Sequence, residues 1–219
     1  MLPLYKNNSA FFIPYFVFLL AGGFVLVLWN KPEIHLFINR YHSPGFDLFF
    51  EYYTNVGLGW LIIPVALALS FVRLRYVIIS LLGFLLVFII NDSIKQFAAT
   101  PRPIEVFSQL HQSLYFVPEV EMFHMNSFPS GHTAVAFCLF AIVAFVTPNK
   151  AIKFTCFLIA ILVAYSRMYL SEHFLIDVYF ASFIGVICAV IAYTVGMKLV
   201  WLNKFPQMDK PLINLHKAK

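Results

Sequence analysis

The 219-residue sequence has little charge and few cysteines. Asp, Glu, Lys and Arg make up only 11% of it, whereas soluble domains carry about 25%. Its cysteines, Cys138, Cys156 and Cys188, lie one in each of three apolar runs and lack the paired spacing of a zinc or thiol-redox motif. We therefore expect them to be small core residues. The net charge of +5 is not clustered with exposed aromatic residues, so nucleic acid is not an expected partner.

What the sequence has instead is apolar residues, 61% of the total, gathered in long runs. The runs are about 15 to 20 residues long, which is near the length that a helix needs to cross roughly 30 Å of hydrocarbon. The runs cover about 11–29, 58–72, 76–94, 131–147, 153–170 and 176–197. Separate spans must satisfy their backbone hydrogen bonds internally, which requires helices. The sequence predicts an all-α integral membrane protein, a six-transmembrane-helix bundle that forms a single domain over residues 1–219.

The first run contains small residues at 21–23, where a leader could be cleaved. Its hydrophobicity continues past them to Trp29, which favours an uncleaved span. With six spans, both termini share a side, and Lys and Arg concentrate on the cytoplasmic side of a membrane protein. The cations predicted on that side are Lys6, Arg73, Arg75, Lys150, Lys153, Lys198, Lys204, Lys210, Lys217 and Lys219. The opposite side has Lys31, Arg40, Lys95, Arg102 and Arg167. We therefore expect cytoplasmic termini.

The longest connection, 103–129, follows the third predicted span and is rich in Phe, Tyr and Met. Loops of this length are usually functional or mobile, and its aromatic residues suit a membrane interface. We interpret it as a flap near the lipid headgroups on the non-cytoplasmic side. A purely structural loop is the alternative.

Polar residues cluster where three spans end on that same side. Lys95 ends the third span, and Arg102 lies between two prolines that stop a helix. Such cations are either interfacial anchors or anion ligands. Ser130 is a good N-cap for the following helix, and Gly131 allows an oxyanion close to the unpaired N–H groups of the helix start. His132 follows in the first turn.

The third cluster lies between the last two spans. His173 and Asp177 are four residues apart, so a helix would place them on one face. A carboxylate on one imidazole nitrogen fixes the tautomer and frees the other nitrogen for attack. Arg167 adds a planar fork of donors suited to phosphate, which a simple His–Asp pair between helices does not explain. Together the clusters supply the positioning and charge neutralisation that phosphoryl transfer needs, without a metal.

Three strings carry a family resemblance: K-x6-R-P (Lys95 to Pro103), P-S-G-H (Pro129 to His132) and S-R-x5-H-x3-D (Ser166 to Asp177). They are similar to the complete signature of the phosphatidic acid phosphatase type 2 (PAP2) superfamily, in order and spacing, over about 58–197.

The resemblance implies a role for each matched residue. His173 is the nucleophile that forms a phosphohistidine, Asp177 orients it, and His132 is the general acid. The implied phosphate ligands are Lys95, Arg102, Ser130, Gly131 and Arg167. The resemblance also implies metal-independent hydrolysis of lipid phosphates on the non-cytoplasmic side of a bacterial inner membrane, with no cofactor. Glu172 lies outside the signature, has no implied role and is expected to face solvent.

Other interpretations of these residues remain open. A phosphohistidine can pass its phosphoryl group to an acceptor other than water, which would make the protein a phosphotransferase. Buried charges also line transport pathways, but here the spans are almost uniformly apolar between their ends. His132 and His173 could instead bind a metal. The soluble haloperoxidase branch shares the motifs, and the apolar spans argue against it. Neither the lipid substrate nor the oligomeric state follows from the sequence.

Overall fold

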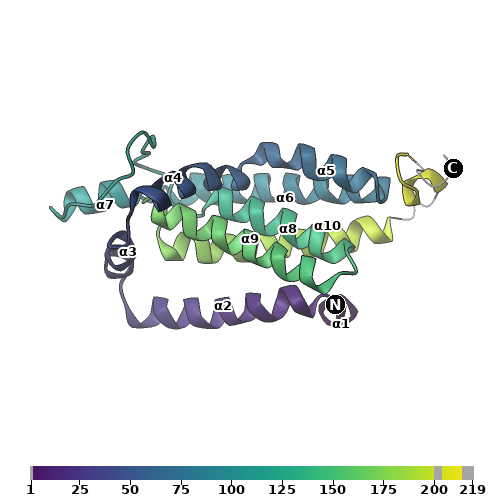
Figure 1. Cartoon of the computed structure of the whole chain (residues 1–219), viewed down its shortest axis with the longest axis horizontal. Coiled ribbons are helices and arrows are strands. Elements are labelled where there is room, and N and C mark those ends of the chain that lie inside the picture. The colour runs from purple at the N-terminus through teal and green to yellow at the C-terminus, as the bar shows by residue number, and fades with distance from the viewer. Residues whose placement is uncertain (1, 200–203, 214–219) are drawn as a thin grey trace.

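The structure is a computed structural model that describes residues 2–199 and 204–213. Its elements are helices joined by turns and loops (Figure 1). The α-helices are α1 (Leu2–Asn7), α2 (Ser9–Leu28), α3 (Lys31–Asn39), α4 (Pro44–Tyr53), α5 (Ile62–Ser70), α6 (Leu74–Ala98), α7 (Pro103–Gln109), α8 (Gly131–Val146), α9 (Lys150–Tyr169) and α10 (Leu175–Lys198). The short 3-10 helices are η1 (Thr54–Gly57), η2 (Gly59–Leu61) and η4 (Pro206–Asp209). The predicted all-α fold is confirmed.

Four helices, α2, α6, α9 and α10, are long and apolar enough to cross a membrane. Their bounds agree with four predicted spans to within a few residues. The chain is therefore an integral membrane protein. The predicted span at 58–72 corresponds to the helical segment Gly59–Ser70. A second segment that was not predicted, Pro44–Gly57, precedes it, and the two meet at an angle of 59°.

The bend occurs at Leu58, which is extended, with ψ 145°. Glycines flank Leu58 because a side chain at either position would clash with neighbouring helices. A Cβ atom on Gly57 would lie 2.7 Å from Val163 Cγ1 and 2.8 Å from His132 Cβ, and one on Gly59 would lie 3.0 Å from Phe84 Cζ. Any larger residue at position 57 would push η1 away from α8 and α9. The bend thus brings η1 against the start of α8.

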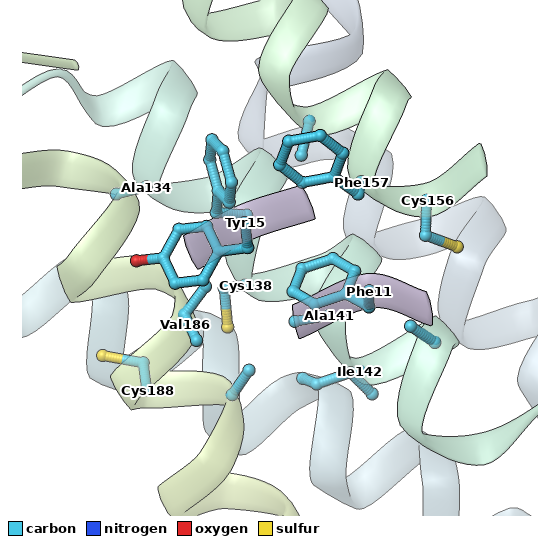
Figure 2. Close-up of a cluster of buried hydrophobic side chains, with 14 of the residues drawn as sticks. Phe11, Tyr15, Ala134, Cys138, Ala141, Ile142, Cys156, Phe157, Val186 and Cys188 are labelled. Atoms are coloured by element: carbon cyan, nitrogen blue, oxygen red, sulfur yellow. The ribbon is translucent and has the colours of Figure 1, made fainter. Parts of the chain in front are cut away.

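Helix α8 forms the centre of the bundle, with ten of its 16 residues buried. Its alanines allow close helix approach: a Cβ atom on Gly185 of α10 would lie only 2.4 Å from the carbonyl oxygen of Ala134. Figure 2 shows Phe11 and Tyr15 of α2 packed among side chains of α8, α9 and α10. The three cysteines are buried and free, as expected.

The long helices run between the two ends of the bundle (Figure 1). We call the "site end" the one where α6 and α9 finish and α8 and α10 begin; α3 and α7 lie there too. The "terminal end" holds α1, η4, the start of α6 and the start of α9. Of the cations grouped with the termini by sequence, Lys217 and Lys219 lie outside the described residues.

Besides the short α1, three α-helices were not predicted. Helices α3 and α4 occupy the region between the first two predicted spans, and α7 begins the 103–129 loop. Each has a proline in its first turn, where the missing N–H costs nothing. Helix α3 also has a capping box, in which Asn30 and Glu33 exchange side-chain and backbone hydrogen bonds.

Candidate active site

Arg102 is fixed by the returning end of the loop that follows α7. The Arg102 N–H donates to the His124 carbonyl (2.8 Å), and the Ser127 N–H donates to the Thr100 carbonyl (3.0 Å), so the two segments run side by side. The Arg102 Nε–H donates to the Met125 carbonyl (3.0 Å). This pairing holds the arginine in the interior of the site end, where only 8% of it is exposed.

The start of α8 faces Lys95 in the last turn of α6. Ser130 caps α8, accepting from the Thr133 N–H (3.4 Å) and the Thr133 hydroxyl (3.0 Å). A Cβ atom on Gly131 would lie 4.0 Å from Lys95 Nζ and 3.6 Å from Asn91 Nδ2. The lysine ammonium and the helix N-terminus therefore meet, a combination that attracts anions.

Arg167, near the end of α9, is buried with 7% exposure and reaches two other segments. Its Nη1 donates to the Thr54 hydroxyl of η1 (2.7 Å), and its Nη2 lies 3.3 Å from Glu172 Oε2. The buried Nε–H has no hydrogen-bond partner. A guanidinium group held at two nitrogens and open at a third can bind an oxyanion.

Glu172 is buried, with 2% exposure, so the expectation that it faces solvent is wrong. The same Oε2 atom that contacts Arg167 also pairs with Arg102 Nη1. The physical reason is charge: two buried guanidinium groups need an anion nearby, because burying unpaired charge is costly. The carboxylate thus joins the first and third sequence clusters.

Asp177 and His173 do lie close together, but not on one helix. Helix α10 begins at Leu175, after His173, and Asp177 occupies its first turn. Asp177 Oδ2 accepts from the Phe174 N–H (2.9 Å) and the Ser127 hydroxyl (2.5 Å), and His173 Nδ1 lies 3.6 Å from the same oxygen. The four-residue spacing correctly predicted that the two side chains lie close together. It was wrong about the cause, because they do not share a face of one helix.

His173 lies between α9 and α10 and is 1% exposed. Burial lowers the pKa of His173 from its usual 6.5 to about 4, although Asp177 acts in the opposite direction. The imidazole is therefore neutral near pH 7. Because Nδ1 faces Asp177, Nε2 is the nitrogen available for attack.

A cavity of about 270 Å³ lies between η1, α6 and α8. Its polar wall contains Lys95, Asn91, Asp92, Gly131 and His132. The remaining lining is largely apolar and includes Leu58, Phe84, Val87, Phe88 and Val135. A polar headgroup and an apolar chain could thus occupy opposite parts of one space.

The structure brings all eight predicted site residues to the site end. Lys95, Gly131 and His132 line the cavity, whereas the other five do not. Within the second group, the Ser130 N–H donates to the Asp177 carbonyl (3.3 Å). The two groups lie close together, since His132 of the cavity wall is within electrostatic range of Arg102, Arg167 and His173.

Sequence reasoning missed three side chains at this site: Ser127, Glu172 and Thr54. Ser127 had a sequence signal, since it lies just before the P-S-G-H string. Glu172 lies directly before the predicted nucleophile, but Thr54 gave no local signal. In the described part of the chain, we find no cluster of three or more His, Cys, Asp or Glu residues placed to hold a metal ion.

The site end of this membrane-embedded bundle gathers three cations, two histidines and two buried carboxylates. Such a set of side chains is typical of an anion-binding site in a membrane protein. The chain belongs to the PAP2 superfamily, whose family model matches residues 76–201. No curated protein sequence matches the chain significantly.

Two solved structures are similar to this chain. The crystal structure of Aquifex aeolicus LpxE is 30% identical, covers 76% of this chain and 96% of its own, and has a TM-score of 0.68. The PAP2-type phosphatidylglycerolphosphate phosphatase of Bacillus subtilis is 22% identical, covers 89% of this chain and 98% of its own, and has a TM-score of 0.60. The second likeness supports the fold alone.

Proposed function

We propose that this protein is a metal-independent lipid phosphatase that works through a phosphohistidine at His173. The observation that carries the proposal is the convergence of Lys95, Arg102 and Arg167 with two histidines at one end of a membrane bundle. Phosphoryl transfer depends mainly on positioning and on neutralising the charge of the phosphoryl oxygens. The site supplies both from its own side chains.

In the proposed reaction, His173 Nε2 attacks phosphorus as the bond to the leaving oxygen breaks, and His132 gives that oxygen a proton. Asp177 holds the imidazole from the Nδ1 side and stabilises its positive charge. Water then attacks the phosphohistidine, His132 accepts a proton from the water, and the N–P bond breaks to release phosphate. Lys95, Arg102, Arg167, Ser130 and the Gly131 backbone hold the phosphoryl oxygens.

The lipid nature of the substrate is supported by the cavity beside His132. Its largely apolar lining continues from the polar wall toward the exposed surface of α6, where Phe88 is 61% exposed. A lipid tail could stay in the bilayer while its phosphate enters. Four candidate substrates are consistent with this arrangement: undecaprenyl diphosphate, phosphatidylglycerol phosphate, phosphatidic acid and lipid A carrying its phosphates.

We further propose six spans in one domain over residues 1–219. Four are the long helices, the fifth is the bent pair Pro44–Gly57 and Gly59–Ser70, and the sixth is α8. Helix α8 is about 24 Å long, shorter than the hydrocarbon layer, and its burial in the bundle fits a start below the membrane surface. The cation-rich terminal end would face the cytoplasm of a bacterial inner membrane.

Purified protein in detergent, given a panel of lipid phosphates, tests the function directly. We expect phosphate release from at least one lipid, unaffected by a chelator. The variant His173→Ala should lower release by about 10³-fold or more, because it removes the nucleophile. Retention of more than a tenth of the activity in that variant would disprove the nucleophile assignment. Dependence on added divalent metal would disprove metal-independent catalysis.

The same assay separates hydrolysis from phosphotransfer. A hydrolase releases one phosphate for each lipid consumed. If lipid is consumed while free phosphate falls short and a phosphorylated acceptor accumulates, the site is a phosphotransferase.

A further inference from the structure

Glu172 is an acidic residue in the candidate site for which the proposed reaction gives no role. Its Oε2 contacts both Arg102 and Arg167, which approach the site from different segments, the turn after α6 and the end of α9. The side chain is 2% exposed. Asp177, the other carboxylate among these groups, is already held by Ser127 and Phe174. Glu172 is therefore the carboxylate that joins the two guanidinium groups.

The bridge leaves part of the Arg167 guanidinium available. Glu172 uses Nη2 of Arg167, and Thr54 uses Nη1, but the buried Nε–H of Arg167 has no partner. A buried donor without a partner is rare and calls for an explanation. A phosphoryl oxygen would satisfy it without displacing Glu172. The geometry fits a fixed bridge behind the phosphate site better than a carboxylate that occupies the site.

Glu172 is itself held firmly by its neighbours. Its N–H donates to the Arg167 carbonyl (3.0 Å), and its own carbonyl accepts from Arg102 Nη1 (3.4 Å). The preceding Ser171 adopts a positive φ of 56°, and its hydroxyl lies 3.1 Å from His35 Nε2 and 3.2 Å from Asn39 Nδ2 of α3. Helix α3 thus anchors the turn that carries both Glu172 and His173.

Charge gives the bridge a second effect. Lys95, Arg102 and Arg167 carry three positive charges, and Glu172 and Asp177 carry two negative charges. Without Glu172 the two guanidinium groups would repel each other in a site of low dielectric, where like charges interact strongly. They would then separate or rotate away from the positions suited to phosphate.

We propose that Glu172 is a positioning residue. It holds Arg102 and Arg167 together as one clamp for the phosphoryl group in the transition state of its transfer. This inference rests on the proposed function. A preorganised clamp stabilises the transition state more than the ground state, so its loss should affect turnover and transition-state mimics more than the binding of free phosphate.

The test compares Glu172→Gln with the matched control Glu105→Gln, which removes a carboxylate that pairs with His124 and Gln109 in the loop. The probes are orthovanadate, which copies the five-coordinate geometry of phosphoryl transfer, and inorganic phosphate. Inhibition constants come from the lipid assay, and dissociation constants come from the thermal shift that each anion produces. Binding can thus be measured even in a protein that releases no phosphate from lipids.

We expect Glu172→Gln to lower kcat/KM by about 10²-fold and to weaken vanadate binding by a similar factor. Binding of inorganic phosphate should change less than about threefold, and Glu105→Gln should resemble the unaltered protein. Glu172→Asp, which keeps the charge, should recover part of both losses. A purely structural role would reduce the amount of folded enzyme without changing the ratio of vanadate to phosphate affinity.

Two results would overturn the inference. One is an unchanged vanadate-to-phosphate affinity ratio in Glu172→Gln, or in Glu172→Asp if the glutamine variant does not fold. The other is tighter binding of both anions, which would show that the carboxylate competes for the phosphate site. If the unaltered protein releases no phosphate from any lipid, the proposed function fails, and the affinity ratio still tests the clamp.

Discussion

Both ends of the bundle bury cationic side chains, but the two ends differ in how completely protein groups satisfy the hydrogen bonds of those side chains. At the terminal end, Arg75 is 2% exposed and donates from Nε and Nη2 to the two carboxylate oxygens of Asp209 (2.9 Å each) and from Nη1 to the Gly196 carbonyl (3.1 Å). Lys153, 4% exposed, donates to the Asn7 carbonyl (2.6 Å) and also contacts the Asn8 side chain. Protein groups satisfy these cations.

At the site end the partners are incomplete. Of the five buried side-chain atoms without a partner in the described part of the chain, four lie there. They are Arg167 Nε, His173 Nδ1, Asn91 Oδ1 and His35 Nδ1. Buried charge alone therefore does not identify a functional site in this protein. A better marker is the Arg167 Nε–H, a buried donor that the fold leaves without a partner and that a bound anion could satisfy. His173 Nδ1 instead faces Asp177 Oδ2 at 3.6 Å.

The strongest test of this contrast makes the same substitution at each end. Arg167→Lys replaces a planar fork by a point charge and cannot keep the contacts to Thr54 and Glu172 while also binding phosphate. We expect kcat/KM for a lipid phosphate to fall by about 10²-fold. Arg75→Lys should stay within about threefold of the unaltered enzyme per folded molecule. Activity must be normalised to folded protein, measured by size exclusion in detergent.

Comparable losses of activity in the two lysine variants would break the contrast. Because activity is normalised to folded protein, such losses would show that the terminal end controls the site.

The sequence predicted the long helices well because an apolar run of the right length leaves little choice of structure. Predicted runs 76–94 and 176–197 correspond to Leu74–Ala98 and Leu175–Lys198. Helices α3 and α4 were missed because they are short and less apolar than the spans. Their signals lay in the caps, the Asn30–Glu33 box and the Ser43–Pro44 start.

The sequence predicted which residues belong to the candidate site better than it predicted how they are arranged in space. Motif spacing named His132, His173 and Asp177, but it could not show what links the motifs. Glu172 and Arg102 are 70 residues apart, and Thr54 and Arg167 are 113 apart. Such pairs depend on how helices pack, which a single sequence does not encode locally. The bend at Leu58, which positions Thr54, is of the same kind.

A pH profile tests whether His173 is as buried in the working enzyme as in this structure. Because burial lowers its pKa to about 4, His173 should remain neutral, and nucleophilic, as the pH falls from 7 to 5. Burial raises the pKa of Glu172 above its usual 4.5, so protonation of this carboxylate adds an acidic limb of its own. The profile is therefore measured in Glu172→Gln, where the remaining acidic limb of kcat/KM should have its midpoint at about pH 4. Below it, activity should fall about tenfold per pH unit, since the protonated imidazole cannot attack.

The substrate's own second ionisation, at a pKa of about 6, has to be measured separately and removed from the profile. A corrected midpoint near 6.5, the usual value for histidine, would mean that His173 is hydrated during catalysis. The site end would then be more accessible to water than in this structure, and its polar groups would not be buried without partners.

The smallest expected effect lies at the terminal end, with Asp209→Asn. This change weakens the pair with Arg75, but Asp209 is 49% exposed and Arg75 keeps its bond to the Gly196 carbonyl. An ion pair with one solvent-exposed partner contributes at most about 1 kcal/mol. We expect a Tm lower by about 2–4 °C, measured by thermal unfolding in detergent, and kcat/KM within about twofold of the unaltered enzyme. A large loss of activity at an unchanged Tm would show that this pair is coupled to the site across the full length of α6.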